Sequence, residues 1–182
     1  QKESRVTRSG FGRRLRAVHG RLDPGVLADI AAGLAAASDR WLDAAAAEPV
    51  RLLATPTYEA WAVTTEPGAG VGLHDHGESA LVLAVVGGEL HERTVVDGEV
   101  ADDVLARGRL RWVAPGVVHS LANRGGTPAT TVQVFSPPLA QRTRFDGDGA
   151  GLRGVDVVDA PPALDAARGA SYLHPSAARH GP

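Results

Sequence analysis

Two histidines, His74 and His76, flank Asp75 at the end of a run of β-forming residues. Side chains at i and i+2 of a strand lie on the same face, about 6.6 Å apart along the backbone, so both imidazoles can approach one metal ion. The chain has no cysteine, which excludes thiolate metal sites, iron–sulfur clusters, disulfides and a cysteine nucleophile. Any metal must be held by histidine, carboxylate or water. Taken alone, the pair is equally consistent with two solvated histidines on a surface strand.

The residues around this pair, and around a third histidine, have a characteristic spacing. The first set is Gly68, His74, His76 and Gly88, and the second set is Gly108, Gly116, His119 and Asn123. These sets follow the two cupin motifs, except that the proline of the second motif is Pro115 instead of residue 114. The sequence therefore resembles a cupin. The resemblance implies that His119 is the third metal ligand, on a strand adjacent across a small barrel.

The glutamate that the first cupin motif normally carries is missing, and its position is Leu81. Three neutral imidazoles leave a divalent metal with its full charge and about three open positions in octahedral geometry. Such a centre suits an anionic substrate that binds through more than one atom. A thiolate is the obvious candidate, with O2 as the second substrate.

Further motifs narrow the resemblance. They are Arg51-Leu52-Leu53, Tyr58-Glu59-Ala60-Trp61, Pro67-Gly68, Leu73-His74-Asp75-His76-Gly77-Glu78-Ser79-Ala80, Gly88-Glu89-Leu90, His119 and Ser136-Pro137-Pro138-Leu139. Over residues 51–139, the chain is similar to the cysteine dioxygenase type (thiol dioxygenase) family of cupins. That resemblance implies Fe(II) bound by His74, His76 and His119, and insertion of both atoms of O2 into a small thiol. It also implies that Arg51 binds the substrate carboxylate in a bidentate pair, with a surface ion pair as the alternative.

The last strand of the barrel departs from this family. Members usually place Ser, His and Tyr at alternating positions, where this chain has Thr131, Gln133 and Phe135. The tyrosine hydroxyl and the titratable imidazole are therefore absent, although Thr131 can still orient Gln133 beside the substrate. We expect Gln133 and Phe135 to line the substrate pocket, and a catalytic part for Thr131 and Gln133 stays open. If these three residues face the cavity, Val132 and Val134 face outward, under the N-terminal helices.

Three more residues are candidates for the substrate-binding wall, namely Leu81, Tyr58 and Trp61. In mammalian members, a cysteine at the position of Leu81 is crosslinked to the tyrosine at the position of Phe135, so this crosslink cannot form here. The pocket should therefore be more apolar than the family norm. Tyr58 and Trp61 are each equally compatible with a place in the ordinary core.

The elements that position these residues begin with two helices. Asp23 and Pro24 supply an N-cap and a first-turn proline, and a second helix from Trp41 to Glu48 ends at Pro49. Seven short strands separated by Gly and Pro turns follow: 58–65, 71–76, 80–86, 89–96, 110–114, 117–122 and 130–135. The predicted fold is all-β, an antiparallel jelly-roll cupin barrel preceded by N-terminal α-helices.

The domain organisation follows from the composition. The chain has 182 residues, 43% of them hydrophobic and 22% charged, which indicates one globular domain and excludes disorder of the whole chain. We predict a flexible basic arm over 1–21 and a single cupin domain over 22–144, with helices in 22–48 and a barrel over about 52–139. A Gly/Pro/Ala-rich tail over 145–182 completes the chain.

Charge and hydropathy limit the partners. The formal net charge of −2 argues against a nucleic-acid interface. The longest apolar run, residues 80–86, is far shorter than the ~20 residues that a membrane span needs. We therefore expect a soluble, cytoplasmic protein whose partners are a small cysteine-like thiol and O2, with neither nucleic acid nor membrane. A homodimer remains an open expectation.

Several functions compete. The leading hypothesis is Fe(II)-dependent oxidation of cysteine or a similar thiol, with Ni(II) or another divalent metal as the alternative cofactor. A diverted cysteine oxygenase would give a rearranged or decarboxylated sulfur product in specialised metabolism. A Ni or Zn cupin that isomerises or hydrolyses its substrate is a second class, and a non-catalytic binding module is a third.

Overall fold

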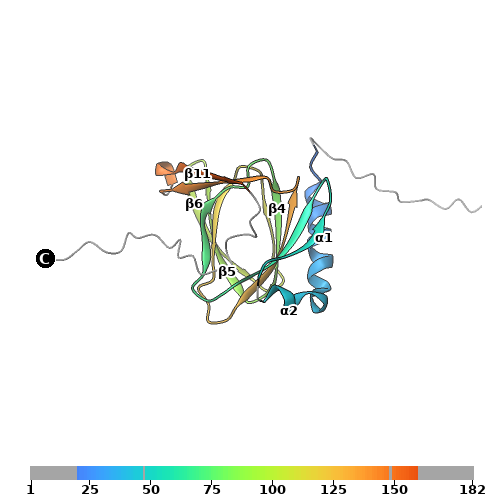
Figure 1. Cartoon of the computed structure of the whole chain (residues 1–182). Helices are drawn as coiled ribbons and strands as arrows, with labels where there is room; N and C mark the ends of the chain where they lie inside the picture. The colour runs from blue at the N-terminus through green and yellow to red at the C-terminus, as the bar shows by residue number, and fades with distance from the viewer. Residues whose placement is uncertain (1–19, 47, 148, 160–182) are drawn as a thin grey trace, which may run out of the picture.

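The computed structural model describes residues 20–46, 48–147 and 149–159 of the chain. Two antiparallel β-sheets face one another and enclose a barrel, and the first helix covers the outer side of one sheet (Figure 1). The predicted all-β barrel with preceding helices is therefore confirmed. Nearly all of the predicted basic arm, and the chain from residue 160 on, lie outside the described residues.

The first sheet has five strands and the second has six. In spatial order the first contains β1 Val50–Ala54, β2 Glu59–Thr65, β9 Ala129–Ser136, β4 Ala80–Gly87 and β7 Leu110–Val113. In spatial order the second contains β11 Arg153–Asp159, β10 Gln141–Asp146, β3 Gly70–His74, β8 Val118–Ala122, β5 Glu89–Val96 and β6 Glu99–Ala106. All neighbouring strands in the described part of the chain pair antiparallel.

The first helix, α1 Pro24–Ala36, forms where the capping residues predict it. The Asp23 carboxylate accepts a 2.8 Å hydrogen bond from the backbone N–H of Gly25, which satisfies one of the free donors at the helix start. The predicted second helix is shorter than expected: a 3₁₀ turn η1 Ser38–Arg40 leads into α2 Leu42–Ala45. The helices thus begin as predicted, and the second ends earlier than predicted.

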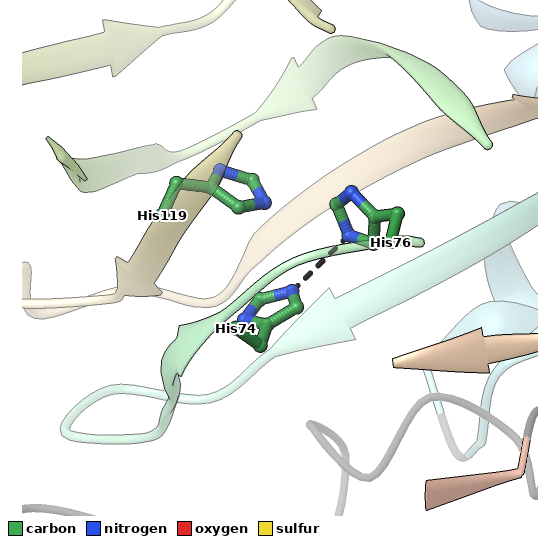
Figure 2. A group of neighbouring side chains, drawn as sticks. All are labelled: His74, His76 and His119. Atoms are coloured by element: carbon green, nitrogen blue, oxygen red, sulfur yellow. Dashed lines mark hydrogen bonds between the residues drawn. The ribbon is translucent and has the colours of Figure 1, made fainter. Parts of the chain in front are cut away.

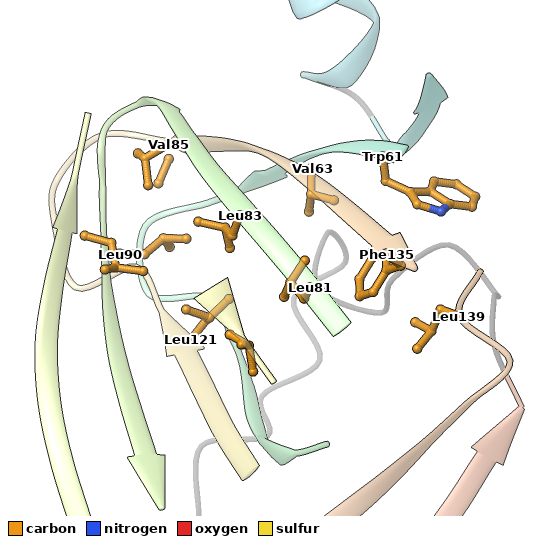
Figure 3. Close-up of a cluster of buried hydrophobic side chains, with 12 residues drawn as sticks. Trp61, Val63, Leu81, Leu83, Val85, Leu90, Leu121, Phe135 and Leu139 are labelled. Carbon is orange, nitrogen blue, oxygen red and sulfur yellow. The ribbon is translucent and has the colours of Figure 1, made fainter. Parts of the chain in front are cut away.

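The central strands of the first sheet, β2, β9 and β4, have two buried faces. Val63 and Phe135 point into the barrel, where they meet side chains from the second sheet such as Leu121 (Figure 3). Val132 and Val134 point to the other face and pack with Leu27 of α1 and its neighbours. The predicted alternation along β9 is confirmed, because Phe135 belongs to the interior cluster and Val132 and Val134 belong to the cluster under α1. Residues 131, 133 and 135 therefore belong to the barrel interior.

The predicted boundary between barrel and tail is wrong. The chain from residue 145 was expected to be a tail, yet β10 runs to Asp146 and β11 adds a further strand over 153–159. The two strands pair along their length, and Arg144 of β10 pairs with His74 of β3. Almost all of β11 is exposed, including its two alternating valines, Val155 and Val157, so the strand lacks the buried face that a core strand would have.

Two other strands were not predicted, for related reasons. The strand β6 carries mostly exposed side chains, with only Leu105 buried, because it forms the free edge of the second sheet. The strand β1 is the edge of the first sheet and has no fully buried side chain. No helix in the described part of the chain has the length and apolar character that crossing a bilayer requires.

Candidate metal centre

The three predicted metal ligands converge inside the barrel (Figure 2). His74 is the last residue of β3 and His119 lies on the neighbouring strand β8, where the register places the two residues directly opposite each other. Side chains of directly paired residues in antiparallel strands point to the same face. Strand pairing therefore brings together two histidines that are far apart in the sequence.

His76 reaches the centre in a different way from the one predicted. The strand stops at His74, so the alternation expected through residue 76 does not apply. The Asp75 carboxylate accepts hydrogen bonds from the backbone N–H groups of Gly77 (3.1 Å) and Thr143 (3.0 Å), and the Asp75 N–H donates to the Thr143 carbonyl (3.0 Å). This turn, fastened to β10, places His76 beside the centre.

The distances between the imidazoles suit one shared cation. The Nε2 atoms of His74 and His76 lie 3.2 Å apart, and the candidate ligand atoms of all three histidines lie within 4.8 Å of one another. Two nitrogens bound at about 2.0–2.1 Å to one metal ion, at a right angle, are about 3 Å apart. The closest pair already has nearly this separation.

The hydrogen-bond partners of the rings also fit a metal. The Nδ1 of His74 donates to the Gly72 carbonyl (2.8 Å), and the Nδ1 of His119 donates to the Glu92 carboxylate (2.9 Å). These acceptors assign the proton to Nδ1 and leave Nε2 as a lone-pair donor. The His119 Nε2 is buried, and no described residue forms a hydrogen bond with it. A divalent cation bound there would satisfy this atom, so the residues present fit a metal ion.

Burial keeps two of the imidazoles neutral. For His74, burial is the main cause that lowers the pKa well below its usual value, and repulsion by His119 adds to it. For His76, burial again lowers the pKa most, followed by repulsion from His74 and His119. A neutral imidazole is the form that binds a metal, so protons compete weakly with a cation at these two residues.

The wall beside the imidazoles is apolar. The Phe135 ring lies 5.3 Å from the His76 ring, edge to face, and Phe135 pairs with Leu81 across β9 and β4. Both side chains are completely buried. Among the described residues, no carboxylate joins the three-histidine cluster. Leu81, at the position of the usual glutamate, therefore leaves the centre with nitrogen ligands alone.

Gln133 and Thr131 lie on the same interior face of β9 and contact each other. The Gln133 amide donates a 3.3 Å hydrogen bond to the Thr131 hydroxyl, which donates in turn to the Val63 carbonyl at 3.4 Å. Gln133 is opposite Trp61 of β2, a residue of the interior cluster. Thr131 thus orients the Gln133 side chain, as expected from the sequence, and Trp61 lies in the barrel wall.

The other two predicted substrate residues lie farther out. Arg51 is exposed on β1, opposite Trp61, and its guanidinium carbon lies 5.6 Å from the centre of the Trp61 ring. This cation–π contact holds Arg51 on the rim of the interior face. Tyr58 packs instead with the cluster under α1, on the same side as Ala60 and Ala62, so its prediction as a pocket residue is wrong.

The structure shows a buried ion pair behind His119 that was not predicted from the sequence. Glu92 of β5 is buried, and its second carboxylate oxygen lies 2.6 Å from the Nε of Arg111 on β7. The signal was present, because Glu92 is two residues after Leu90 in a predicted strand and so shares the face of a core residue. A charged residue on the apolar face of a strand indicates a buried charge, and such a charge is almost always paired.

Arg142 was missed as well, because the barrel was expected to end near residue 139. It is buried on β10, and its charge contributes to the lowered pKa of both His74 and His76. The strand that the sequence did not reveal thus brings a positive charge close to the imidazoles.

A family model described as Cupin matches residues 49–150, which is more than half of the chain. The chain belongs to the cupin family. The two sheets and the three histidines of the barrel agree with this membership. A search of curated proteins found no match.

The solved structures that match this chain include three proteins with different descriptions. TT1209 from Thermus thermophilus is 20% identical, with 50% of this chain and 85% of that chain covered and a TM-score of 0.44. A double-stranded β-helix domain protein from Klebsiella pneumoniae is 25% identical, with 60% and 85% covered and a TM-score of 0.43. An oxalate oxidase is 23% identical, with 43% and 41% covered and a TM-score of 0.41.

Proposed function

We propose that this cupin is a mononuclear non-haem Fe(II) oxygenase that oxidises the sulfur of cysteine or a similar small carboxylate-bearing thiol with O2. One observation carries the proposal: three buried imidazoles converge with no carboxylate among the candidate ligands of the described residues. Neutral ligands leave the full charge of a divalent cation at the centre, which favours an anionic ligand such as a thiolate.

A ferrous ion bound by His74, His76 and His119 supplies the redox chemistry that couples O2 to the sulfur. In the proposed net reaction, a thiol and O2 give a sulfinic acid, so both oxygen atoms bond to sulfur. The sulfur provides all the electrons that O2 accepts, and no external reductant is needed. The chain contributes the apolar wall of Phe135 and Leu81, which keeps water away from the reacting sulfur.

Arg51 is the proposed anchor for the substrate carboxylate. Its guanidinium is exposed on the rim of the interior face and is held by Trp61, so it can form a bidentate pair with a carboxylate. We expect Arg51→Gln to raise KM for cysteine while the metal content stays unchanged. Arg107→Gln, at an exposed turn, removes the same charge and is the matched control. Unchanged KM in Arg51→Gln would refute the anchor assignment.

Gln133 shares the interior face of β9 with Phe135, and its amide cannot take up or release a proton near neutral pH. The thiol oxidation proposed here therefore proceeds without a titratable side chain on β9. Gln133 and Phe135 stand where family members have His and Tyr, and this change favours a variant of the proposal. In that variant cysteine gives a rearranged or decarboxylated sulfur product.

The decisive experiment loads the purified protein with Fe(II) under anaerobic conditions and adds cysteine or other small thiols. O2 is then admitted, its uptake is recorded, and the products are identified by mass spectrometry. A gain of two oxygen atoms supports the dioxygenase, and loss of CO2 or a rearranged nitrogen supports the diverted reaction. Absence of thiol-dependent O2 uptake by protein that retains Fe(II) refutes both.

Zinc or nickel chemistry is the second candidate function, because three histidines and an open position also form a catalytic zinc site. Metal analysis of protein expressed without added metal, combined with O2 uptake, separates the two candidates. Zinc or nickel in the protein, with no thiol-dependent O2 uptake after iron loading, favours the hydrolytic or isomerising class. Bound metal with neither type of activity favours a binding module.

A further inference from the structure

The barrel buries one carboxylate directly behind a metal ligand. The side chain of Glu92 is 1% exposed, and one of its oxygens accepts the 2.9 Å hydrogen bond from Nδ1 of His119. Burial of a carboxylate costs free energy unless the group is paired and hydrogen bonded. We propose that Glu92, together with Arg111, is a positioning device that holds His119 in its metal-binding tautomer and strengthens its bond to the metal. The inference rests on the proposed metal centre.

The geometry shows how Glu92 acts through His119. An acceptor at Nδ1 keeps the proton on that atom, so Nε2 presents its lone pair to the other two imidazoles. The buried His119 Nε2 has no hydrogen-bond partner within the described part of the chain, which is the arrangement that a metal ligand needs. A carboxylate at the opposite ring nitrogen also makes the imidazole a stronger donor. Glu92 thus supplies the influence of a carboxylate without occupying a coordination position.

Arg111 makes this arrangement possible. Its Nε lies 2.6 Å from the second Glu92 oxygen, and its guanidinium also donates a 3.1 Å hydrogen bond to the Thr94 hydroxyl. Arg111 belongs to β7 of the first sheet, whereas Glu92 and His119 belong to strands of the second sheet. The ion pair therefore joins the two sheets at the metal centre and offsets the charge of the buried carboxylate.

The chain also contains a matched surface pair on the same strand. Arg93 of β5 forms two hydrogen bonds with Asp102 of β6, at 2.8 and 2.9 Å, and Asp102 is largely exposed. Asp102→Asn removes one carboxylate charge and breaks an ion pair, as Glu92→Gln does, but on the exposed edge strand β6 instead of in the barrel interior. Asp102→Asn is the control for general effects of charge.

The test titrates metal-free protein with Co(II), by calorimetry and by the visible absorption of bound Co(II). We expect wild-type protein to bind one Co(II) and Glu92→Gln to bind it roughly 10–100-fold more weakly, with an altered absorption spectrum. Asp102→Asn should bind like the wild type. Circular dichroism and thermal unfolding of the metal-free variants establish that each one is folded.

The double variant Glu92→Gln/Arg111→Gln separates positioning from a purely structural role. If the single variant binds weakly only because Arg111 loses its partner, the double variant should recover wild-type affinity, and that recovery overturns the inference. Persistent weak binding in the folded double variant supports it. Wild-type Co(II) affinity and spectrum in Glu92→Gln also overturn it. A wild-type protein that binds no Co(II) overturns the metal centre itself, which is a different result.

Discussion

Acid should destabilise the metal-free protein through two buried imidazoles. Burial lowers the pKa of His74 and His76 well below the unfolded value of about 6.5, so the folded protein keeps both rings neutral while the unfolded chain takes up protons. The unfolded state therefore binds more protons in mildly acidic solution. The contribution of these two neutral rings to the free energy of unfolding is present above about pH 6.5. It is lost as the pH drops from there towards the lowered pKa values.

The size of this effect follows from proton linkage. Between pH 7.5 and 5.5, each imidazole that stays neutral in the folded state lowers the free energy of unfolding by about 1.4 kcal/mol, and two lower it by about 2.7 kcal/mol. For a domain of this size, that corresponds to a drop in Tm of roughly 5–11 °C. Replacing one of the rings, as in His76→Gln, should halve the loss to about 1.4 kcal/mol.

The assay is urea unfolding of chelator-treated protein at both pH values, for the wild type and for His76→Gln. The difference between the two pH-dependent losses isolates the contribution of His76, because carboxylates that titrate over the same interval are common to both proteins. His91→Gln, on the accessible side of β5, leaves both buried rings in place and should keep the wild-type loss. An equal loss in the wild type and His76→Gln would refute the conclusion that His76 is neutral in the folded, metal-free protein.

Three further changes test the fold and the centre. Divalent metal at 100-fold excess over its Kd should add about 2.7 kcal/mol to the free energy of unfolding, and thermal scans should show no such gain for His119→Ala. Phe135→Ala empties a fully buried site beside His76 and should cost about 3–5 kcal/mol in urea unfolding, and a loss below about 1 kcal/mol would contradict the packing. Asp23→Ala removes the α1 cap and should cost about 1 kcal/mol while Co(II) affinity, measured by titration, stays unchanged.

Much of the candidate site could be predicted from local patterns. The spacing of His74 and His76, with His119 in the second motif, indicated the ligand set, because the family motifs specify which strands carry each ligand. Strand alternation placed Gln133 and Phe135 inside the barrel and Val134 under the helix, and the structure confirms that division. Alternation depends only on the backbone of one strand, so it is visible in the sequence.

Other features depend on contacts between distant segments. The strands β10 and β11 are stabilised by pairing with each other and with β3, and their exposed side chains carry no core pattern. The direction of His76 is set by hydrogen bonds between Asp75 and Thr143 across two segments. No window of the sequence contains both partners of such a contact.

The sequence by itself determined that this is a cysteine-free cupin barrel with three histidines as its candidate metal ligands, because motif spacing and strand alternation are local properties. Only the tertiary structure decided what lies behind those ligands. Glu92 and Arg111 come from strands of different sheets and meet behind His119, and Arg142 arrives on a strand with no apolar signature. Charges that act on a buried centre are positioned by the closing of the barrel, which brings together residues that no sequence pattern links.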